Sequence, residues 1–200
     1  SSACGSCLVR WRGETGGVSS LLVSLGQALA RRADVDHVVT IGRGTVTDAL
    51  FGLTPFDDLP LCFGTIAFGD DIRPAEHAGA AWEHFPAIER GIRRALQLAG
   101  PVDVFHLRMA EAGTLAGWEV AAALGIPVCF SVAPDPHNVL QSLQARGELD
   151  EAAFIELEHQ SHVWYRARLI EQLARDADRL ALFPRTQSRS VFEPVGLHST

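Results

Sequence analysis

The stretch "VDVFHLRMAEAGTLAGWEVAAALGIPVCFSV", residues 102–132, decides the fold. It begins with the apolar run "VDVFHL" (102–107) and ends with "IPVCFSV" (126–132), and both have the length and composition of buried strands. The segment between them, "EAGTLAGWEVAAALG" (111–125), has the length of a helix and closes on Gly125, the residue type favoured just beyond a helix C-terminus. This order of strand, helix and strand predicts a βαβ unit with two parallel strands.

The same alternation continues on both sides of this unit. Strands are expected at 7–11, 37–42, 61–69 and 178–184, and helices at 17–32, 84–99, 138–147 and 150–178. The pattern predicts an α/β fold, a Rossmann-like doubly wound parallel sheet with helices on both faces. Ligands of such sheets bind at the carboxyl ends of the strands.

Composition excludes several classes of protein. Of the 200 residues, 47% are hydrophobic and 20% are charged, which is typical of a folded globular chain. The net charge of −7 argues against a nucleic-acid groove, which needs a basic stripe. No apolar run is long enough for a transmembrane segment and no signal peptide is visible, so we expect a cytoplasmic protein.

The cysteines predict no metal site. Cys4 and Cys7 form a C-x-x-C pair, whereas Cys62 and Cys129 stand alone among apolar residues. A zinc site would need a second pair or histidines at matching spacing, and neither follows Cys7. The four residues are therefore expected to be structural or incidental, in a reducing compartment.

Polar residues follow three of the expected strands. "RGETGG" (12–17) follows the first strand, "HLRMAEAG" (106–113) ends the strand at 102–107, and "APDPHN" (133–138) follows the strand at 126–132. Because the carboxyl ends of parallel strands share one edge, these segments predict a ligand site there. The candidate residues in them are Gly16, Gly17, His106, Arg108, Glu111, Asp135 and His137.

Each of these features also has a simpler interpretation. The two glycines suit either a tight turn or the close approach of an anion to a helix N-terminus. Arg108 and Glu111 fit a solvated i,i+3 pair, and Asp135 fits a helix cap. A dinucleotide-binding oxidoreductase is disfavoured, because neither "GETGG" (13–17) nor "IGRG" (41–44) completes the G-x-G-x-x-G pattern.

Four segments in order resemble one family. "GETGGVSSLLVSLGQALA" (13–30) resembles the D-T-G-G loop and first helix of retaining glycosyltransferases built from two Rossmann domains (the GT-B fold). It is most similar to the sucrose-phosphate synthase and sucrose synthase branch of glycosyltransferase family 4. The further matching segments are "FGDD…WEHFPAIERGIRRAL" (68–96), "VFHLRMAEAG" (104–113) and "RARLIEQLARDAD" (166–178).

The resemblance implies half of an enzyme that moves a sugar from a nucleotide-sugar donor to a hydroxyl acceptor with retention, without a metal or other cofactor. Residues 1–184 would form the acceptor-side domain and 185–200 the start of a linker, with the donor-binding domain absent from this chain. Gly16 and Gly17 would let the backbone approach the donor diphosphate. Arg166 and Arg168 would bind an acceptor phosphate, although they also fit solvated helix residues.

The same resemblance assigns the catalytic candidates. Glu111 stands where the family has an acceptor-binding aspartate. The histidine of the family's T-G-H-S segment, which follows the strand, aligns with Ala133. His137, four residues further on, would supply the imidazole instead. Arg108 replaces a second family histidine and Val18 a glutamine, so fructose 6-phosphate is not the expected acceptor. The alternative function is a non-catalytic α/β module that binds a sugar or phosphoester.

Overall fold

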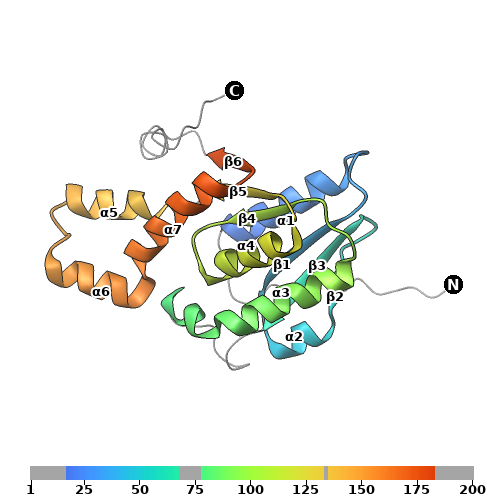
Figure 1. Cartoon of the computed structure of the whole chain (residues 1–200), viewed down its shortest axis with the longest axis horizontal. Coiled ribbons are helices and arrows are strands. Elements are labelled where there is room, and N and C mark those ends of the chain that lie inside the picture. The colour runs from blue at the N-terminus through green and yellow to red at the C-terminus, as the bar shows by residue number, and fades with distance from the viewer. Residues whose placement is uncertain (1–16, 68–77, 133–134, 183–200) are drawn as a thin grey trace. The chain divides into compact units, whose positions relative to one another are not determined.

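The structure is a computed structural model that describes residues 17–67, 78–132 and 135–182 (Figure 1). It has an α/β architecture, as the sequence predicted. The chain divides into two compact units. The first unit is Ser1–Pro74 with Arg90–Pro101, and the second is Ala75–Glu89 with Val102–Thr200.

The first unit contains a mixed three-stranded sheet in the order β1-β3-β2. β1 and β3 pair in parallel from Val38–Leu61 to Gly44–Ala67, and β2 pairs antiparallel with β3. The elements are α1 (Gly17–Ala30), β1 (Val38–Gly44), α2 (Val46–Leu50), β2 (Leu53–Pro55), β3 (Leu61–Ala67) and the part of α3 (Phe85–Ala99) from Arg90 onward.

The antiparallel β2 corrects the expectation of a purely parallel sheet. Only residues 56–60 connect β2 to β3, and so short a segment allows a hairpin but not the crossover that a parallel pair requires. Sequence reasoning also missed α2, although its capping box is visible in the sequence: Thr45 Oγ1 accepts the Asp48 N–H at 3.1 Å, and Asp48 Oδ2 accepts the Thr45 N–H at 3.1 Å.

The second unit contains a parallel three-stranded sheet in the order β4-β5-β6. The β4–α4–β5 segment is the βαβ unit that the sequence predicted, and Gly125 ends α4 in the left-handed conformation at φ 67°. The elements are the 3₁₀ helix η1 (Ala78–His84), the start of α3, β4 (Phe105–Arg108), α4 (Ala112–Leu124), β5 (Val128–Val132), α5 (Pro136–Ala145), α6 (Glu151–Ser161), α7 (Val163–Asp176) and β6 (Arg179–Leu182).

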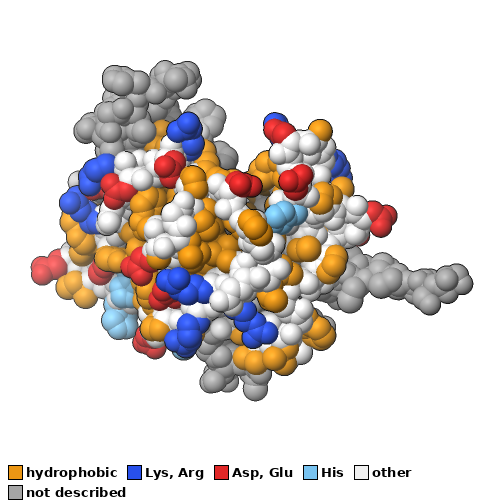
Figure 2. Space-filling view, turned by 45° about the vertical axis from the view of Figure 1, so that its right-hand side comes forward, with side chains coloured by type: hydrophobic (Ala, Val, Ile, Leu, Met, Phe, Trp, Pro, Cys, Tyr) orange, Lys and Arg blue, Asp and Glu red, His pale blue; other side chains and the backbone are white. Residues whose placement is uncertain are grey.

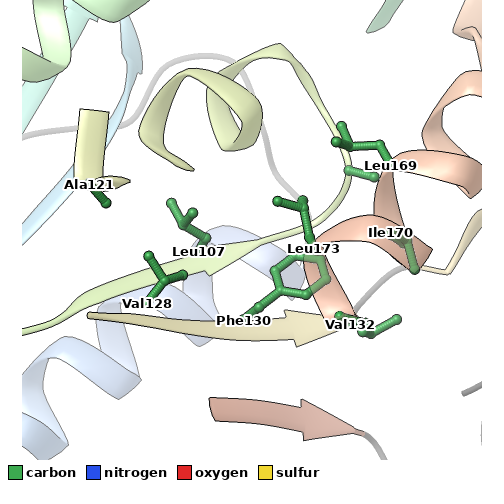
Figure 3. Close-up of a cluster of buried hydrophobic side chains, with 10 residues drawn as sticks. Leu107, Ala121, Val128, Phe130, Val132, Leu169, Ile170 and Leu173 are labelled. Atoms are coloured by element: carbon green, nitrogen blue, oxygen red, sulfur yellow. The ribbon is translucent and has the colours of Figure 1, made fainter. Parts of the chain in front are cut away.

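The core of the second unit covers one face of this sheet (Figure 3). Phe130 at the centre of β5 is fully buried, and it lies beside Leu107 of β4 in register. Ile170 and Leu173 of α7 pack on it from the helix side. Because successive side chains of a strand point to opposite faces, the residues between these core positions point away from the core.

The helix expected at 150–178 is wrong, because it consists of two helices. His162 adopts a left-handed conformation (φ 49°, ψ 43°) and ends α6. The Glu158 side chain then accepts the Trp164 N–H at 2.7 Å, which satisfies one of the donors at the start of α7. A local capping contact therefore divides a segment whose periodicity is continuous.

Two further expectations differ from the structure. The strand expected at 102–107 begins only at Phe105. Within the described residues, hydrogen bonds define two separate three-stranded sheets and not the one sheet that the sequence predicted. The strand expected at 7–11 lies outside the described residues.

Candidate functional site

The candidate site lies at the carboxyl edge of the parallel sheet in the second unit. The turn after β4 and the segment from Asp135 to His137 after β5 both follow strands whose carboxyl ends share this edge. α7 runs from this edge back to the start of β6 at the opposite edge. The first turns of α7 therefore lie at the carboxyl edge as well.

The turn after β4 presents a carboxylate to its surroundings. Met109 has a φ of 67°, a conformation that non-glycine residues rarely adopt, and Thr114 Oγ1 donates to the Arg108 carbonyl at 2.5 Å. Glu111 then occupies the N-cap position of α4, but its side chain makes no capping hydrogen bond. The Glu111 carboxylate is therefore available for contacts outside its own helix.

Arg166 of α7 holds this turn. Its Nε donates to the Ala110 carbonyl at 2.7 Å, and its NH2 lies 3.4 Å from Glu111 Oε1. The Arg166 side chain is 13% exposed and the Glu111 side chain is 36% exposed. Arg166 is therefore not simply a solvated helix residue, and the structure brings together two residues that the sequence assigned to one site.

Asp135 and His137 form a compact pair at the start of α5. Asp135 caps this helix, as one of the sequence interpretations expected, because its Oδ1 accepts the His137 backbone N–H at 2.9 Å. The same oxygen lies 2.8 Å from His137 Nδ1. The Asp135 side chain is 3% exposed, and its Oδ2 has no hydrogen-bond partner in the described part of the chain.

Glu171 of α7 connects this pair to Arg168. Its Oε1 lies 3.1 Å from His137 Nε2, and its Oε2 accepts a hydrogen bond from Arg168 NH1 at 2.8 Å. Asp135, His137, Glu171 and Arg168 thus form a chain of alternating charge. We call these four residues the charge chain.

The charge chain favours the imidazolium form of His137. Both ring nitrogens face carboxylate oxygens, and only a doubly protonated ring can donate to both. The hydrogen bond to Asp135 raises the pKa of His137 most, burial lowers it, and the hydrogen bond to Glu171 raises it further. In this arrangement neither ring nitrogen is free to act as a base.

His106 and Arg108 lie on the other face of the sheet from the core. They alternate along β4 with Leu107, which is buried in the core. His106 Nε2 lies 2.7 Å from Ser131 Oγ, and burial, followed by the charge of Arg108, lowers the pKa of His106. Burial lowers the pKa of Arg108, whose NH1 has no hydrogen-bond partner among the described residues.

Sequence reasoning missed two residues of the site, Glu171 and Trp164. Trp164 is 54% exposed, and the Arg168 guanidinium carbon lies 6.0 Å from its ring centroid. Trp164, Arg168 and Glu171 follow one another at helical spacing on one face of α7. That spacing is visible in the sequence, but the contact between Glu171 and His137, 34 residues apart, is not.

The two glycines of the predicted anion site are not part of the second unit. Gly17 is the first residue of α1, in the other unit, and Gly16 lies outside the described residues, as do Cys4 and Cys7. Cys62 and Cys129 are free and half-buried.

Across residues 17–67, 78–132 and 135–182, no group of three or more His, Cys, Asp or Glu is arranged to hold a metal. No helix in the same ranges is long and apolar enough to cross a bilayer. No protein-family model matches the chain, and no curated protein matches it either.

Proposed function

We propose that this chain is the acceptor-side domain of a GT-B glycosyltransferase, which moves a sugar from a nucleotide-sugar donor to a hydroxyl acceptor. The observation that carries the proposal is the convergence of two ionic groups on α7, the Glu111–Arg166 pair and the charge chain, at the carboxyl edge of a parallel sheet. Carboxylates and guanidinium groups are the side chains that hold sugar hydroxyls and phosphates by directed hydrogen bonds.

The exposed members of these groups face the acceptor in this proposal. The partly exposed Glu111 carboxylate accepts a hydrogen bond from an acceptor hydroxyl. The Arg168 side chain is 63% exposed and binds a further oxygen or a phosphate of the acceptor. The Trp164 ring beside it packs on the C–H groups of a sugar ring, because an indole presents a broad apolar face.

The buried members position the exposed ones. Arg166 fixes the turn that carries Glu111 through its bond to the Ala110 carbonyl. His137 lies between Asp135 and Glu171 and holds Glu171 toward Arg168. We therefore assign His137 a positioning role and keep Glu111 as the residue that touches the acceptor hydroxyl.

The donor side of the proposal depends on the family resemblance. Gly17, the first residue of α1, and Gly16, which precedes it in the sequence, are assigned to the donor diphosphate, and a second Rossmann domain supplies the remaining donor contacts. His106 and Arg108 stay assigned to substrate binding. The proposal involves no metal and no further cofactor, because a retaining transfer of this type relies on the charges of the protein and of the substrates.

A second function, a non-catalytic module that binds a sugar or phosphoester, is favoured by one observation. Carboxylates engage both ring nitrogens of His137, and the family's histidine position holds Ala133. Without a free imidazole, the same exposed residues still bind a sugar. A full-length protein that binds an acceptor sugar and transfers nothing to it would support this alternative.

Acceptor binding is tested on the 200-residue chain by NMR titration with glucose, glucose 6-phosphate and UDP-glucose. We expect Trp164→Ala and Glu111→Gln to weaken binding of the sugar that binds best by about tenfold, because each removes a direct contact. Arg168→Gln is expected to weaken glucose 6-phosphate more than glucose, since it removes a charge that only the phosphate needs.

Arg175→Gln is the matched control, because Arg175 is an exposed arginine in the last turn of the same helix. It should leave every affinity within about twofold of the parent value, the size expected for a surface change away from the site. Equal losses in Arg175→Gln and Arg168→Gln, or no binding of any of the three compounds, would contradict the proposed site.

A further inference from the structure

The first unit contains a cavity of about 240 Å³ that the proposed sugar site does not use. It lies between β3, α3 and the segment that joins α2 to β2. Leu53, the first residue of β2, pairs with Gly64 of β3. The next residues of β3, Thr65–Ala67, therefore extend past β2, and they line the cavity. Its remaining walls come from Ala49 and Gly52, from Leu53 and from one face of α3.

The walls of this cavity are closely packed. A Cβ atom on Gly91 would lie 2.6 Å from Ile66 Cγ2, and one on Gly64 would lie 3.0 Å from Leu53 Cδ2. The two glycines therefore let α3 and β2 approach β3 more closely than any other residue would allow. The close contacts at Gly64 and Gly91 leave no room for a larger side chain at these two lining positions.

Two exposed arginines line the cavity. Arg90 and Arg94 are one turn apart on α3, and both are exposed. The described residues offer neither of them an ion pair or a hydrogen bond. Arg32, Arg146 and Arg168, in contrast, each bond a carboxylate at 2.7 to 2.8 Å. Among the described residues that line the cavity, the only charged side chains are thus these two arginines, in a chain whose net charge is −7.

Exposed apolar side chains lie in or next to the segments that line the cavity. Leu98 lines it and is 54% exposed, and Leu50 and Phe51, between the lining residues Ala49 and Gly52, are 71% and 74% exposed. Figure 2 shows hydrophobic side chains and arginine side chains exposed on the face that it draws. Large apolar side chains grouped on a surface in this way commonly mark a binding site.

We propose that this cavity binds an amphiphilic anion. Arg90 and Arg94 hold its phosphate or carboxylate head, for which their planar guanidinium groups are suited. Its hydrocarbon body lies against Leu53, Ile66 and Leu98. The volume of about 240 Å³ suits a body of several carbon atoms. The site goes beyond the proposed sugar-binding function and involves other residues.

The experiment uses the 200-residue chain and three probes: hexyl phosphate, inorganic phosphate and 1-hexanol. We expect hexyl phosphate to bind more tightly than either of the others, with NMR shifts at Thr65, Gly91 and Leu98, because only it carries both a charge and an apolar body. Arg90→Gln and Arg94→Gln should each weaken it about tenfold, since each removes one charged hydrogen bond.

Two more variants separate charge from shape. Arg93→Gln is the matched control, with the same charge change on the same helix but outside the cavity lining, and it should leave the affinity within about twofold. Ala49→Leu keeps every charge and fills part of the cavity from α2, and it should weaken hexyl phosphate as well. Circular dichroism establishes that each variant is folded.

The outcomes are distinct. Equal affinities for hexyl phosphate and inorganic phosphate would overturn the proposal, and so would unchanged binding in both Arg90→Gln and Arg94→Gln.

Phosphatidylcholine vesicles that contain phosphatidic acid identify the source of the anion. Binding of both vesicles and hexyl phosphate assigns the site to a lipid headgroup, and binding of hexyl phosphate alone assigns it to a free metabolite. Vesicle binding without hexyl phosphate binding contradicts the cavity proposal.

Discussion

His106 and His137 belong to the same unit but have opposite electrostatic surroundings. His137 lies between the carboxylates of Asp135 and Glu171, and its pKa is raised mainly through the hydrogen bond with Asp135. His106 bonds the neutral Ser131 hydroxyl and lies near Arg108, so burial and then that positive charge lower its pKa. The surroundings therefore favour the charged form of the side chain at His137 and the neutral form at His106.

The pH dependence of stability should differ in sign between the two histidines. The pKa of His137 in the folded chain lies above its ordinary value of 6.5. Its stabilising contribution is therefore fully present below pH 6.5 and is lost as the pH rises through the raised value. We expect the stability difference between the parent and His137→Gln to be larger at pH 5.5 than at pH 9, measured by urea unfolding.

His106→Gln supplies the comparison for this measurement. Because the pKa of His106 is lowered, its neutral form fits the fold, and the parent chain loses stability at this site as the pH falls below 6.5. The difference in the free energy of unfolding between the parent and His106→Gln should therefore become smaller as the pH falls. If both differences changed with pH in the same direction, the assignment of His137 as the buried cation would fail.

Glycine has different roles in two of the helices. In α3, a Cβ atom on Gly91 would lie 2.6 Å from Ile66, so the residue is needed for packing against β3. In α4, nothing lies within 4 Å of the corresponding atom on Gly113. Helix propensity favours alanine equally in both places, so only the surroundings distinguish the two sites.

Gly91→Ala and Gly113→Ala should change stability in opposite directions. Gly113→Ala is expected to stabilise the chain by up to about 1 kcal/mol, because the helix gains propensity without a clash. Gly91→Ala is expected to destabilise it by about 1–3 kcal/mol, because overpacking against Ile66 outweighs that gain. Chemical denaturation of both variants measures the two values. A stabilised Gly91→Ala variant would show that α3 does not pack on β3 at this point.

At the scale of the whole molecule, the two units carry different chemistry. The second unit holds the Glu111–Arg166 pair and the charge chain on a parallel sheet, and the first holds the cavity with Arg90 and Arg94 on a mixed sheet. In the glycosyltransferase proposal, the two units together form only the acceptor-side domain of the enzyme. The same proposal assigns the donor contacts and much of the stabilisation of the transition state to a second domain.

The 200-residue chain alone should therefore bind an acceptor sugar but transfer nothing to it. A radiolabelled donor, UDP-glucose, incubated with the chain and the best-binding acceptor from the titration should give no labelled product above the rate without protein. Addition of a donor-binding Rossmann domain in the same polypeptide should restore transfer. Robust transfer by the chain alone would contradict the division of roles between two domains.

The sequence alone predicted the α/β class, the βαβ unit at 102–132 and the helix end at Gly125, and it offered a helix cap as one interpretation of Asp135, because each depends on neighbouring residues and on regular periodicity. It also placed Glu111, Asp135 and His137 after strands of one sheet, since the rule for carboxyl ends needs only the order of elements.

Only the tertiary structure decided how these residues are partnered. Glu171 reaches His137 across 34 positions, and Arg166 reaches Glu111 across 55. The same is true of the cavity beside Arg90 and Arg94, whose lining comes from three separate stretches of the chain. Contacts between distant segments depend on packing in three dimensions, which periodicity and spacing along the chain do not encode.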